Sequence, residues 1–357
     1  MENKVSEKIS QGRFFEDFTL GETIVHPLPR TITDGDVSLY IALTGSRFAL
    51  HSSDLLAREM GYAVRPLDDV LLFHMVFGKS VTDVSLNAIA NLGYAEVSFP
   101  APVFVGDTVR LESEVIGLRE NSNGKSGIVY IHSTGYNQHD QRILSLKRWV
   151  MVHKRDHETT TGMKEVPETA AVLPIADQLS VPPLKALNTV QTGSAWFWED
   201  YQAGERLNHA EGLTIDNSDH TLATKLYQNN AKLHFDDHMM KSSRMGERLI
   251  YGGHVISLCR TISFNGLGNA MWLYAINAGT HANPTFAGDT IYCFSEVVET
   301  IEHPTRNDVG LLRLRSYGLK NITPDEVDSV KNEEGKYHPY VVLDLDYTVI
   351  IPRRNTQ

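Results

Sequence analysis

FFEDFTLGE, residues 14–22, returns later in the chain as FWEDYQAGE, residues 197–205. The offset between the two copies is 183 residues, and the alignment continues without a gap from Phe14 to Asp54. Over these 41 aligned positions 14 residues are identical, whereas average composition predicts about two or three by chance. A repeat of this length indicates a duplicated domain rather than a solenoid unit of about 20–50 residues.

A second block repeats with an offset that is one residue shorter. PVFVGDTVRLESEV, residues 102–115, returns as PTFAGDTIYCFSEV, residues 284–297. The first block also superimposes titratable residues: His26 on His209, Asp36 on Asp219, His51 on His234 and Asp54 on Asp237. Duplication allows a catalytic site to persist in one copy and to decay in the other, so the two copies can be compared residue by residue.

The repeat divides the 357 residues into two domains. We expect a first domain over residues 13–155 and a second over residues 193–354, called below the first and second halves. Residues 156–192 contain a Thr run and four prolines without a lasting apolar period, which is typical of a linker. We expect this linker to wrap one half onto the other.

The bulk composition excludes several classes of partner. A net charge of −11 argues against a nucleic-acid surface, and no apolar run reaches the length of about 18 residues that spans a membrane. The polar N-terminus lacks the apolar segment of a secretory signal, so we expect a cytoplasmic protein. Cys259 and Cys293 have apolar neighbours, as buried reduced thiols do, and no His/Cys spacing indicates a metal site.

Each half shows the same order of elements. Asp34-Gly35-Asp36 can cap a short helix over 37–43, and 216–219 can cap its copy over 220–226. The elements expected next are short helices over 53–60 and 237–245, long apolar helices over 70–90 and 254–267, and strands over 94–99, 108–118, 127–138, 143–154, 290–299, 310–320 and 340–351, with a hairpin turn at 121–124. One long helix followed by an antiparallel sheet is an α+β pattern. This order is similar to the hotdog fold, so the duplication predicts a double hotdog.

The loop after the first short helix resembles a catalytic motif. In MaoC-like, (R)-specific enoyl-CoA hydratases a Thr-Gly-Asp-x-Asn-Pro-Leu-His loop supplies an Asp and a His that hold and activate one water. Here His51 and His234 stand at the His position, while Ser46 and Asn229 stand at the Asp position. The resemblance implies that His234 is the base and that Asn229 orients the water, because an amide cannot accept the proton. His51 could instead bond only its own loop, and Asn229-Asn230 could be only a turn.

Hydration of an enoyl thioester also needs donors for the thioester oxygen, which gains negative charge. The start of the long helix in the second half, Gly252-Gly253-His254, can supply backbone N–H groups there, as the matching helix does in the MaoC-like family. The first half has Asp68-Asp69 at this point, and two carboxylates would repel an anion. We therefore place catalysis in the second half, with packing alone as the alternative role of the two glycines.

Several stretches of the sequence, spread over nearly the whole chain, resemble a narrower family. Residues 12–18, 45–49, 83–88, 120–125 and 248–257 are similar to β-methylmalyl-CoA dehydratases, also called mesaconyl-CoA hydratases. The resemblance implies reversible hydration of mesaconyl-C1-CoA to β-methylmalyl-CoA by a hydro-lyase that needs no cofactor, CoA being part of the substrate. Its free carboxylate calls for a cation. The candidates are Arg248, Lys232 and Arg47, unless these are only solvated surface charges.

Three alternatives remain open from the sequence. The chain could hydrate an enoyl-CoA with another acyl chain. It could be a hotdog acyl-CoA thioesterase, in which Asp236 or Asp237 would activate water, because a fold does not determine a function. It could also bind acyl-CoA without catalysis, since the motif Asp is missing in both halves. We expect a homodimer, because hotdog sheets commonly pair edge to edge.

Overall fold

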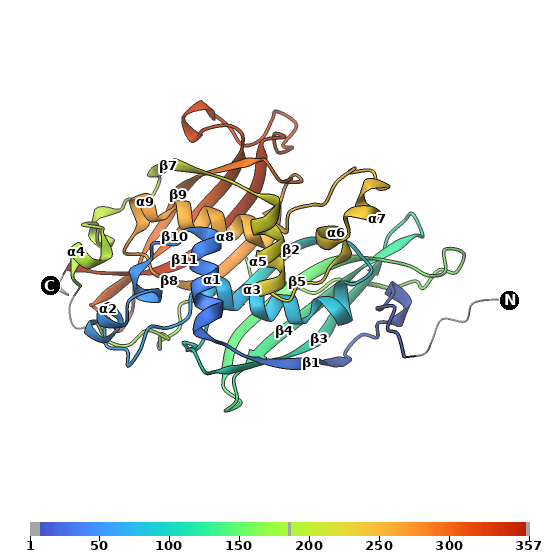
Figure 1. Ribbon diagram of the computed structural model, residues 1–357, viewed down its shortest axis with the longest axis horizontal. Coiled ribbons are helices and arrows are strands. Elements are labelled where there is room, and N and C mark those ends of the chain that lie inside the picture. Colours follow the sequence, from blue (N-terminus) through green and yellow to red (C-terminus); the bar gives the residue numbers. More distant parts are fainter. Residues whose placement is uncertain (1–7, 185–186, 355–357) are drawn as a thin grey trace.

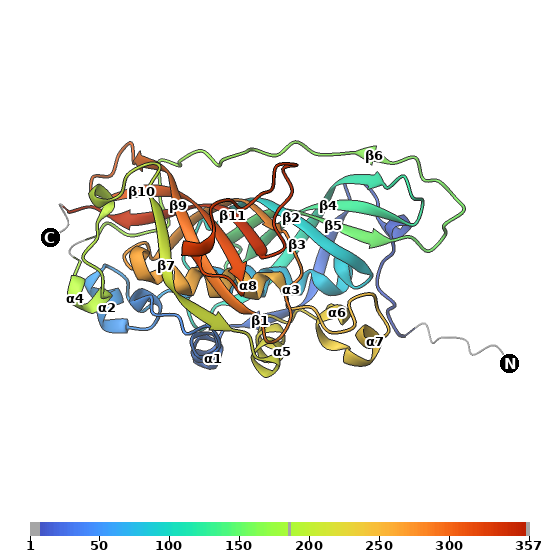
Figure 2. The same ribbon diagram turned by 90° about the horizontal axis from the view of Figure 1, so that it is seen from above.

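The computed structural model describes residues 8–184 and 187–354. One continuous antiparallel sheet forms the body of the molecule, and the main helices cover one of its faces (Figure 1). Seen from above, the linker runs along the opposite face after β6 (Lys164–Glu165), while α4 (Thr189–Thr192), near its end, lies beside α2 (Asp54–Glu59) (Figure 2). Within the described residues no helix is long and apolar enough to cross a membrane.

The strands repeat one topology twice. The first half contributes β1 (Thr23–Thr31), β2 (Ala88–Ser98), β3 (Thr108–Glu120), β4 (Ser126–Tyr136) and β5 (Arg142–His153), and the second half β7 (Arg206–Thr214), β8 (Trp272–His281), β9 (Thr290–Glu302), β10 (Val309–Lys320) and β11 (Val341–Pro352). The order is β1-β3-β4-β5-β2-β8-β11-β10-β9-β7, so the halves are mirrored about the β2–β8 contact. There Tyr94 pairs with Gly279 and Ser98 with Ala275, which joins the halves into one sheet.

The helices repeat in the same way. Those of the first half are α1 (Asp34–Thr44), α2 (Asp54–Glu59) and α3 (Asp69–Lys79), and those of the second half are α5 (Asn217–Leu226), α6 (Lys232–Phe235), α7 (Asp237–Lys241), α8 (Gly252–Ile262) and α9 (Phe264–Leu267). Short 3-10 turns are η1 (Phe15–Asp17), η2 (Ala49–His51), η4 (Trp198–Asp200) and η5 (Pro324–Glu326). Helices α3 and α8 are buried against the sheet, which is the helix-in-sheet arrangement of a double hotdog.

The two long helices meet at the centre of the molecule. His74 Nε2 on α3 lies 2.9 Å from Ser257 Oγ on α8, and these residues are separated by 183 positions, the offset of the repeat. A pair of equivalent residues in contact places the pseudo-two-fold axis between α3 and α8. One apolar cluster runs from Ile32 in the first half to Ile351 in the second. The halves therefore share a core, and a cavity between them has walls from both.

Three predicted helix boundaries were wrong. The helix expected over 254–267 begins at Gly252 and ends at Ile262, and the separate short helix α9 follows it. The helix expected over 70–90 ends at Lys79, a π-helical turn η3 (Val81–Ser85) follows, and β2 begins at Ala88. Apolar spacing continued past the true end because the turn also buries Val81 and Val84. The helix expected over 237–245 ends at Lys241.

The first helix is capped differently from the prediction. Thr33, not the Asp34–Asp36 stretch, occupies the N-cap, and its Oγ1 accepts the Asp36 N–H at 3.2 Å. Asp36 lies inside the helix and its carboxylate accepts the Thr33 N–H at 2.9 Å, which completes a capping box. In the copy, Asp216 occupies the N-cap of α5 without a side-chain cap bond.

The linker follows the seam between the halves. The Ala170 N–H donates to Glu96 Oε1 on β2 at 2.7 Å, and the Leu173 N–H donates to Asn277 Oδ1 on β8 at 3.2 Å. It thus contacts both strands that join the sheet.

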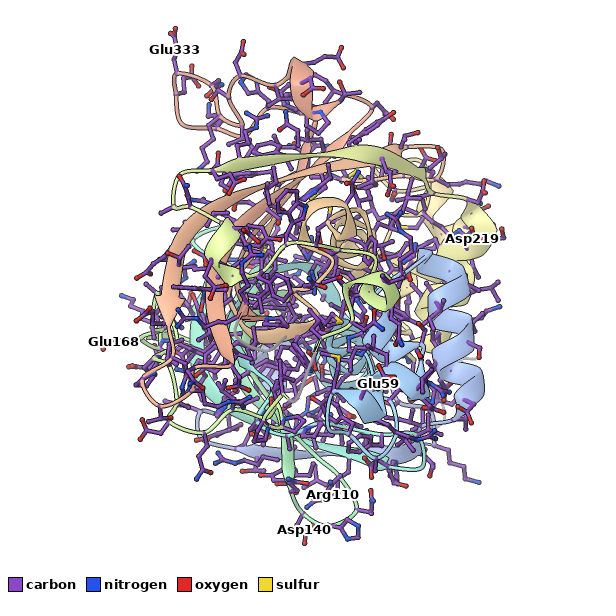
Figure 3. The ribbon with its side chains drawn as sticks, turned by 90° about the vertical axis from the view of Figure 1, so that its left-hand side faces the viewer. Glu59, Arg110, Asp140, Glu168, Asp219 and Glu333 are labelled. Atoms are coloured by element: carbon purple, nitrogen blue, oxygen red, sulfur yellow. The ribbon has the colours of Figure 1, made fainter. Side chains whose placement is uncertain are left out.

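In Figure 3 the labelled Asp140, at the β4–β5 turn, and Glu333, in the β10–β11 loop, lie at opposite ends of the molecule. Cys259 and Cys293 are both buried and unbridged, as expected.

Candidate active site

A cavity of about 240 Å³ lies between the halves. Its wall from the first half is made by the end of α3, the η3 turn and strands β2 and β5; its wall from the second half is made by the α5–α6 loop, α6, the start of α8 and the segment after β8. The polar side chains on its wall are Ser85, Asn91, Tyr94, Arg148, Asn229, His234, Tyr251, His281, Asn283 and Thr285. Both predicted catalytic residues, His234 and Asn229, line it.

His234 is held in one tautomer. Its Nδ1 lies 2.8 Å from the Leu249 carbonyl oxygen, and because a carbonyl only accepts, Nδ1 must carry the proton. In the neutral ring Nε2 therefore keeps a lone pair, and no described residue bonds to it. Burial lowers the pKa of His234 to about 4, and the bond to Leu249 opposes this shift. At neutral pH the ring is a base, 8% exposed, on the wall of the cavity.

Asn229 is positioned by the loop that follows α5. Its Oδ1 accepts the Ala231 N–H at 3.1 Å, which leaves the amide Nδ2 able to donate. The loop presses against α3 at Gly78, where an added Cβ would lie 1.8 Å from the Tyr227 carbonyl oxygen. Only glycine permits this approach, so the short distance between α3 and the loop depends on Gly78.

The start of α8 offers two free backbone donors. The Ile250 N–H donates to Thr285 O and the Tyr251 N–H donates to His220 Nε2, both at 2.9 Å. Among the described residues no acceptor lies within bonding distance of the next two amides, those of Gly252 and Gly253. Free N–H groups at a helix N-terminus favour negative charge. The His281 ring covers Gly252 so closely that an added Cβ would lie 2.5 Å from it.

His254 does not share this arrangement with the two glycines. Its N–H already donates to the Tyr251 carbonyl at 2.8 Å, its side chain is 1% exposed, and it does not line the cavity. The prediction that His254 contributes to the oxyanion site therefore does not fit the geometry. The physical reason is that the first turn of α8 already uses this amide.

The three predicted cations also lie away from the cavity. Arg248 donates to Thr221 Oγ1 at 3.2 Å, to Asn217 Oδ1 at 2.5 Å and to the His234 carbonyl oxygen at 3.5 Å, which ties the segment before α8 to α5 and α6. Lys232 is exposed on α6. Arg47 pairs with Glu211 and lies over the Phe264 ring, 4.7 Å from its centroid. None of the three lines the cavity.

Arg148 was not among the predicted site residues, and within the described part of the chain it is the Lys or Arg that lines the cavity. It lies on β5 and is 1% exposed. On this strand Leu144, Leu146, Val150 and Val152 point inward at every second position, and Arg148 occupies the same series. A charged residue at an inward position of an alternating strand is a signal that the sequence contained.

The equivalent site in the first half is closed. His51 repeats the contact of His234, with Nδ1 3.2 Å from the Pro66 carbonyl, but its Nε2 lies 3.1 Å from the Met271 carbonyl instead of facing a cavity. Asp69 stands where Gly252 stands in the second half and accepts the Leu273 N–H at 2.8 Å. Burial raises the pKa of Asp69 to about 7. This geometry leaves no room for a substrate beside His51.

Two other predictions concern histidines and metals. His26 bonds Asp83 and Ser113, and His209 bonds Asn265 and Ser295, so both tie an edge strand to its neighbours, in line with a role in the fold. Over residues 8–184 and 187–354 no three His, Cys, Asp or Glu side chains come together in a way that could hold a metal ion.

Comparison with known proteins identifies the family. A family model described as mesaconyl-CoA hydratase matches residues 3–324. The chain belongs to the mesaconyl-CoA hydratase family. A β-methylmalyl-CoA dehydratase of Chloroflexus aurantiacus is 50% identical over 353 residues, 98% of this chain and 100% of the relative. A mesaconyl-CoA hydratase of Cereibacter sphaeroides is 50% identical over 348 residues, 97% of this chain and 100% of the relative.

Solved structures agree with this family and with the fold. A MaoC domain protein dehydratase from Chloroflexus aurantiacus superimposes with a TM-score of 0.94 at 50% identity, covering 98% of this chain and 100% of the other. A Mycobacterium tuberculosis protein described as a double hotdog superimposes with a TM-score of 0.70 at 23% identity, covering 96% and 98%. At that identity the second match carries the fold alone, and it confirms the predicted double hotdog.

Proposed function

We propose that this protein catalyses the reversible hydration of mesaconyl-C1-CoA to β-methylmalyl-CoA. Members of its family at 50% identity over nearly the full chain carry the names of that hydro-lyase. The observation that carries the proposal is the cavity itself: His234, with a free Nε2, and Gly252, with a free amide, line one space, and the free amide of Gly253 is the next in the first turn of α8. These are the base and the oxyanion donors that addition of water to an enoyl thioester requires.

The chemistry can be written with these groups. The water proton passes to His234 Nε2 while the water oxygen bonds to the β-carbon. The electron pair of the double bond moves to the thioester oxygen, where the Gly252 and Gly253 N–H groups stabilise the enolate. Protonated His234 then returns the proton to the α-carbon, so that one water is added in total. A pKa lowered to about 4 makes the imidazolium a better proton donor in this second step than an ordinary histidine, and makes the neutral ring a weaker base in the first step.

Asn229 has a positioning role in this scheme. Its Oδ1 is bonded to Ala231, so its Nδ2 can donate to the oxygen of the attacking water. The water then presents its protons to His234. The aromatic rings of Phe77, Tyr94 and Tyr251 also line the cavity and help to exclude bulk water from the enolate.

The thioesterase alternative lacks its key group. Asp236 caps α7 by accepting the Met239 N–H, and Asp237 pairs with Lys241, both outside the cavity. Among the described residues that line the cavity there is no Asp or Glu. A carboxylate that activates water at the carbonyl is therefore missing from the site.

The test is incubation of the purified protein with mesaconyl-C1-CoA. We expect the enoyl-thioester absorbance to fall, a product heavier by one water in the mass spectrum, and no free thiol. Release of CoA thiol would identify a thioesterase instead. Turnover of crotonyl-CoA but not of mesaconyl-C1-CoA would identify a hydratase of another acyl chain, and no turnover of any enoyl-CoA would favour a binding protein. The expected homodimer and cytoplasmic location remain predictions.

A further inference from the structure

Arg148 stands apart from the other charged side chains around the site. Among the described residues that line the cavity it is the one Lys, Arg, Asp or Glu. Of the two histidines there, burial lowers the pKa of both His234 and His281 to about 4, so both are neutral near pH 7. The cavity therefore contains one positive charge and no negative charge of its own.

The partners of Arg148 are all neutral. Nη2 donates to Ser80 Oγ and Ser85 Oγ, each at 2.8 Å, and Nη1 reaches Asn91 Oδ1 only at 3.4 Å. Nε is buried and has no partner. The guanidinium lies 4.5 Å from the centroid of the Phe77 ring. Two of its three nitrogens thus have a weak partner or none, in a side chain that is 1% exposed.

Among the described residues, one other buried Lys or Arg has a carboxylate partner and two have none. Lys154 is 3% exposed and pairs with Glu120 at 2.6 Å. Arg260 is 8% exposed and Lys79 is 7% exposed, and both donate only to neutral groups, but neither lines this cavity. Burying a charge without a counter-ion is costly, and such cations are normally paired. An unpaired cation on the wall of a substrate cavity is expected to receive its counter-ion from the ligand.

We propose that Arg148 is the specificity-determining residue that binds the free carboxylate of the substrate, an inference that rests on the proposed function. In mesaconyl-C1-CoA this carboxylate is bonded to the carbon that water attacks, so it must lie close to His234. Aromatic rings lie between the two positions. The ring centroids of His234 and Tyr251 are 5.6 Å apart and those of Tyr251 and Phe77 are 5.7 Å apart, and the guanidinium of Arg148 stacks on the Phe77 ring. Because both residues line the one cavity, we place the C5 acyl group along this wall, between base and cation. Arg148 comes from the first half and His234 from the second, so one substrate engages both copies of the repeat.

The η3 turn gives Arg148 its place. Ser80 and Ser85 stand at the two ends of this turn, and both bond the guanidinium. Helix α3 ends at Lys79, earlier than the helix expected over 70–90. The η3 turn that follows it binds the guanidinium group of Arg148. In the second half α8 ends at the equivalent residue, Ile262, but the short helix α9 follows it in place of the η3 turn.

The test compares two substrates in two variants. For Arg148→Met we expect kcat/KM on mesaconyl-C1-CoA to fall at least about 100-fold, while kcat/KM on crotonyl-CoA, which has no second carboxylate, changes less than about 3-fold. Arg260→Met, which removes a buried Arg stacked on Phe outside this cavity, should leave the ratio of the two values unchanged. Equal losses on both substrates in Arg148→Met would overturn the proposal.

A second measurement uses only the wild-type protein, so it does not depend on whether a variant folds. The wild-type protein should process the methyl ester of the free carboxyl group of mesaconyl-C1-CoA at least about 100-fold less efficiently than the acid. Equal efficiency would overturn the role of Arg148 while leaving hydration itself established. A wild-type protein that hydrates neither compound would instead refute the proposed function, so the two failures are distinguishable.

Discussion

His234 shows how one backbone carbonyl determines the chemistry of a residue. The bond from Nδ1 to Leu249 selects the tautomer with a free Nε2, and His51 repeats that bond to Pro66 in the first half. The two histidines differ only in what faces Nε2: a cavity in one half and the Met271 carbonyl in the other. His51 is therefore a control residue for substitutions of His234.

We expect His234→Gln to lower kcat for mesaconyl-C1-CoA at least about 100-fold, because the amide cannot take the water proton. His51→Gln should lower the melting temperature, since it disturbs two buried bonds, but should change kcat less than about 3-fold. Steady-state kinetics and thermal melts of both variants check this. If His51→Gln lost as much activity as His234→Gln while still folded, the assignment of catalysis to the second half would fail.

Asn229→Asp restores the carboxylate found in the MaoC-like motif. A negative charge near His234 favours the imidazolium, so the pKa of His234 should rise from its lowered value. The acid limb of the pH profile of kcat/KM should then move to higher pH by about one unit or more. Asn230→Asp is the matched control, because Asn230 is exposed and bonds Thr82 outside the cavity. An acid limb that does not move in folded Asn229→Asp would contradict this role of position 229.

At the scale of the element, the first turn of α8 combines packing and function. The two readings of Gly252 and Gly253 from the sequence were oxyanion donors or close packing, and the geometry contains both features. Their amides are free, and the space of their missing side chains is filled by the His281 and Tyr251 rings. Each glycine allows a ring to approach while its N–H remains available.

Gly252→Ala should therefore reduce activity more than stability. The new Cβ would lie 2.5 Å from the His281 ring, so the ring or the start of α8 must shift. We expect kcat to fall at least about 10-fold, since small misplacements of oxyanion donors are costly. Gly35→Ala in α1 is the control, because its Cβ would meet only Thr33 Oγ1 at 3.5 Å, an ordinary contact. Full activity in Gly252→Ala would remove the α8 amides from the mechanism.

The end of α3 could not be predicted from the spacing of apolar residues. Apolar spacing predicted the long helix but not its end, because η3 buries Val81 and Val84 as a helix would. Conversely, the alternation of β5 places Arg148 on the inward face of the strand, although it belongs to no loop motif. A charge on the buried face of a strand is as informative as a motif residue.

At the scale of the whole molecule, several neutral histidines are buried around the site. Burial lowers the pKa of His234, His254 and His281 to about 4 and that of His220 to about 2. The unfolded chain binds these protons near pH 6.5, whereas the folded chain does not. Asp69 acts with the opposite sign, because its pKa is raised to about 7, but it is one group against four.

The free energy of unfolding should therefore fall as the pH is lowered from about 6.5 towards 4.5, since the unfolded state gains protons that the folded state excludes. Denaturant unfolding at several pH values measures this slope. His254→Leu removes one of these groups away from the cavity wall and should make the slope shallower. A free energy that stays constant or rises over this range would show that the histidines are not held neutral.

The amino-acid sequence alone was enough to recognise the duplication, the double hotdog and the family. These features rest on residues that are close in the chain or repeat at one offset, so alignment and periodicity detect them. His234, Asn229 and the glycines were found for the same reason, as short local patterns. Their catalytic roles remain proposals that the variants above test.

The tertiary structure was needed for everything that depends on contact between the halves. Arg148 on β5 and His234 on α6 line one cavity because β2 pairs with β8 and α3 packs on α8. It was also needed to place Arg248, Lys232 and Arg47 outside that cavity. The physical reason is that a charge near a motif in sequence is still free to point to solvent, whereas a buried unpaired cation is recognised only once its surroundings are known.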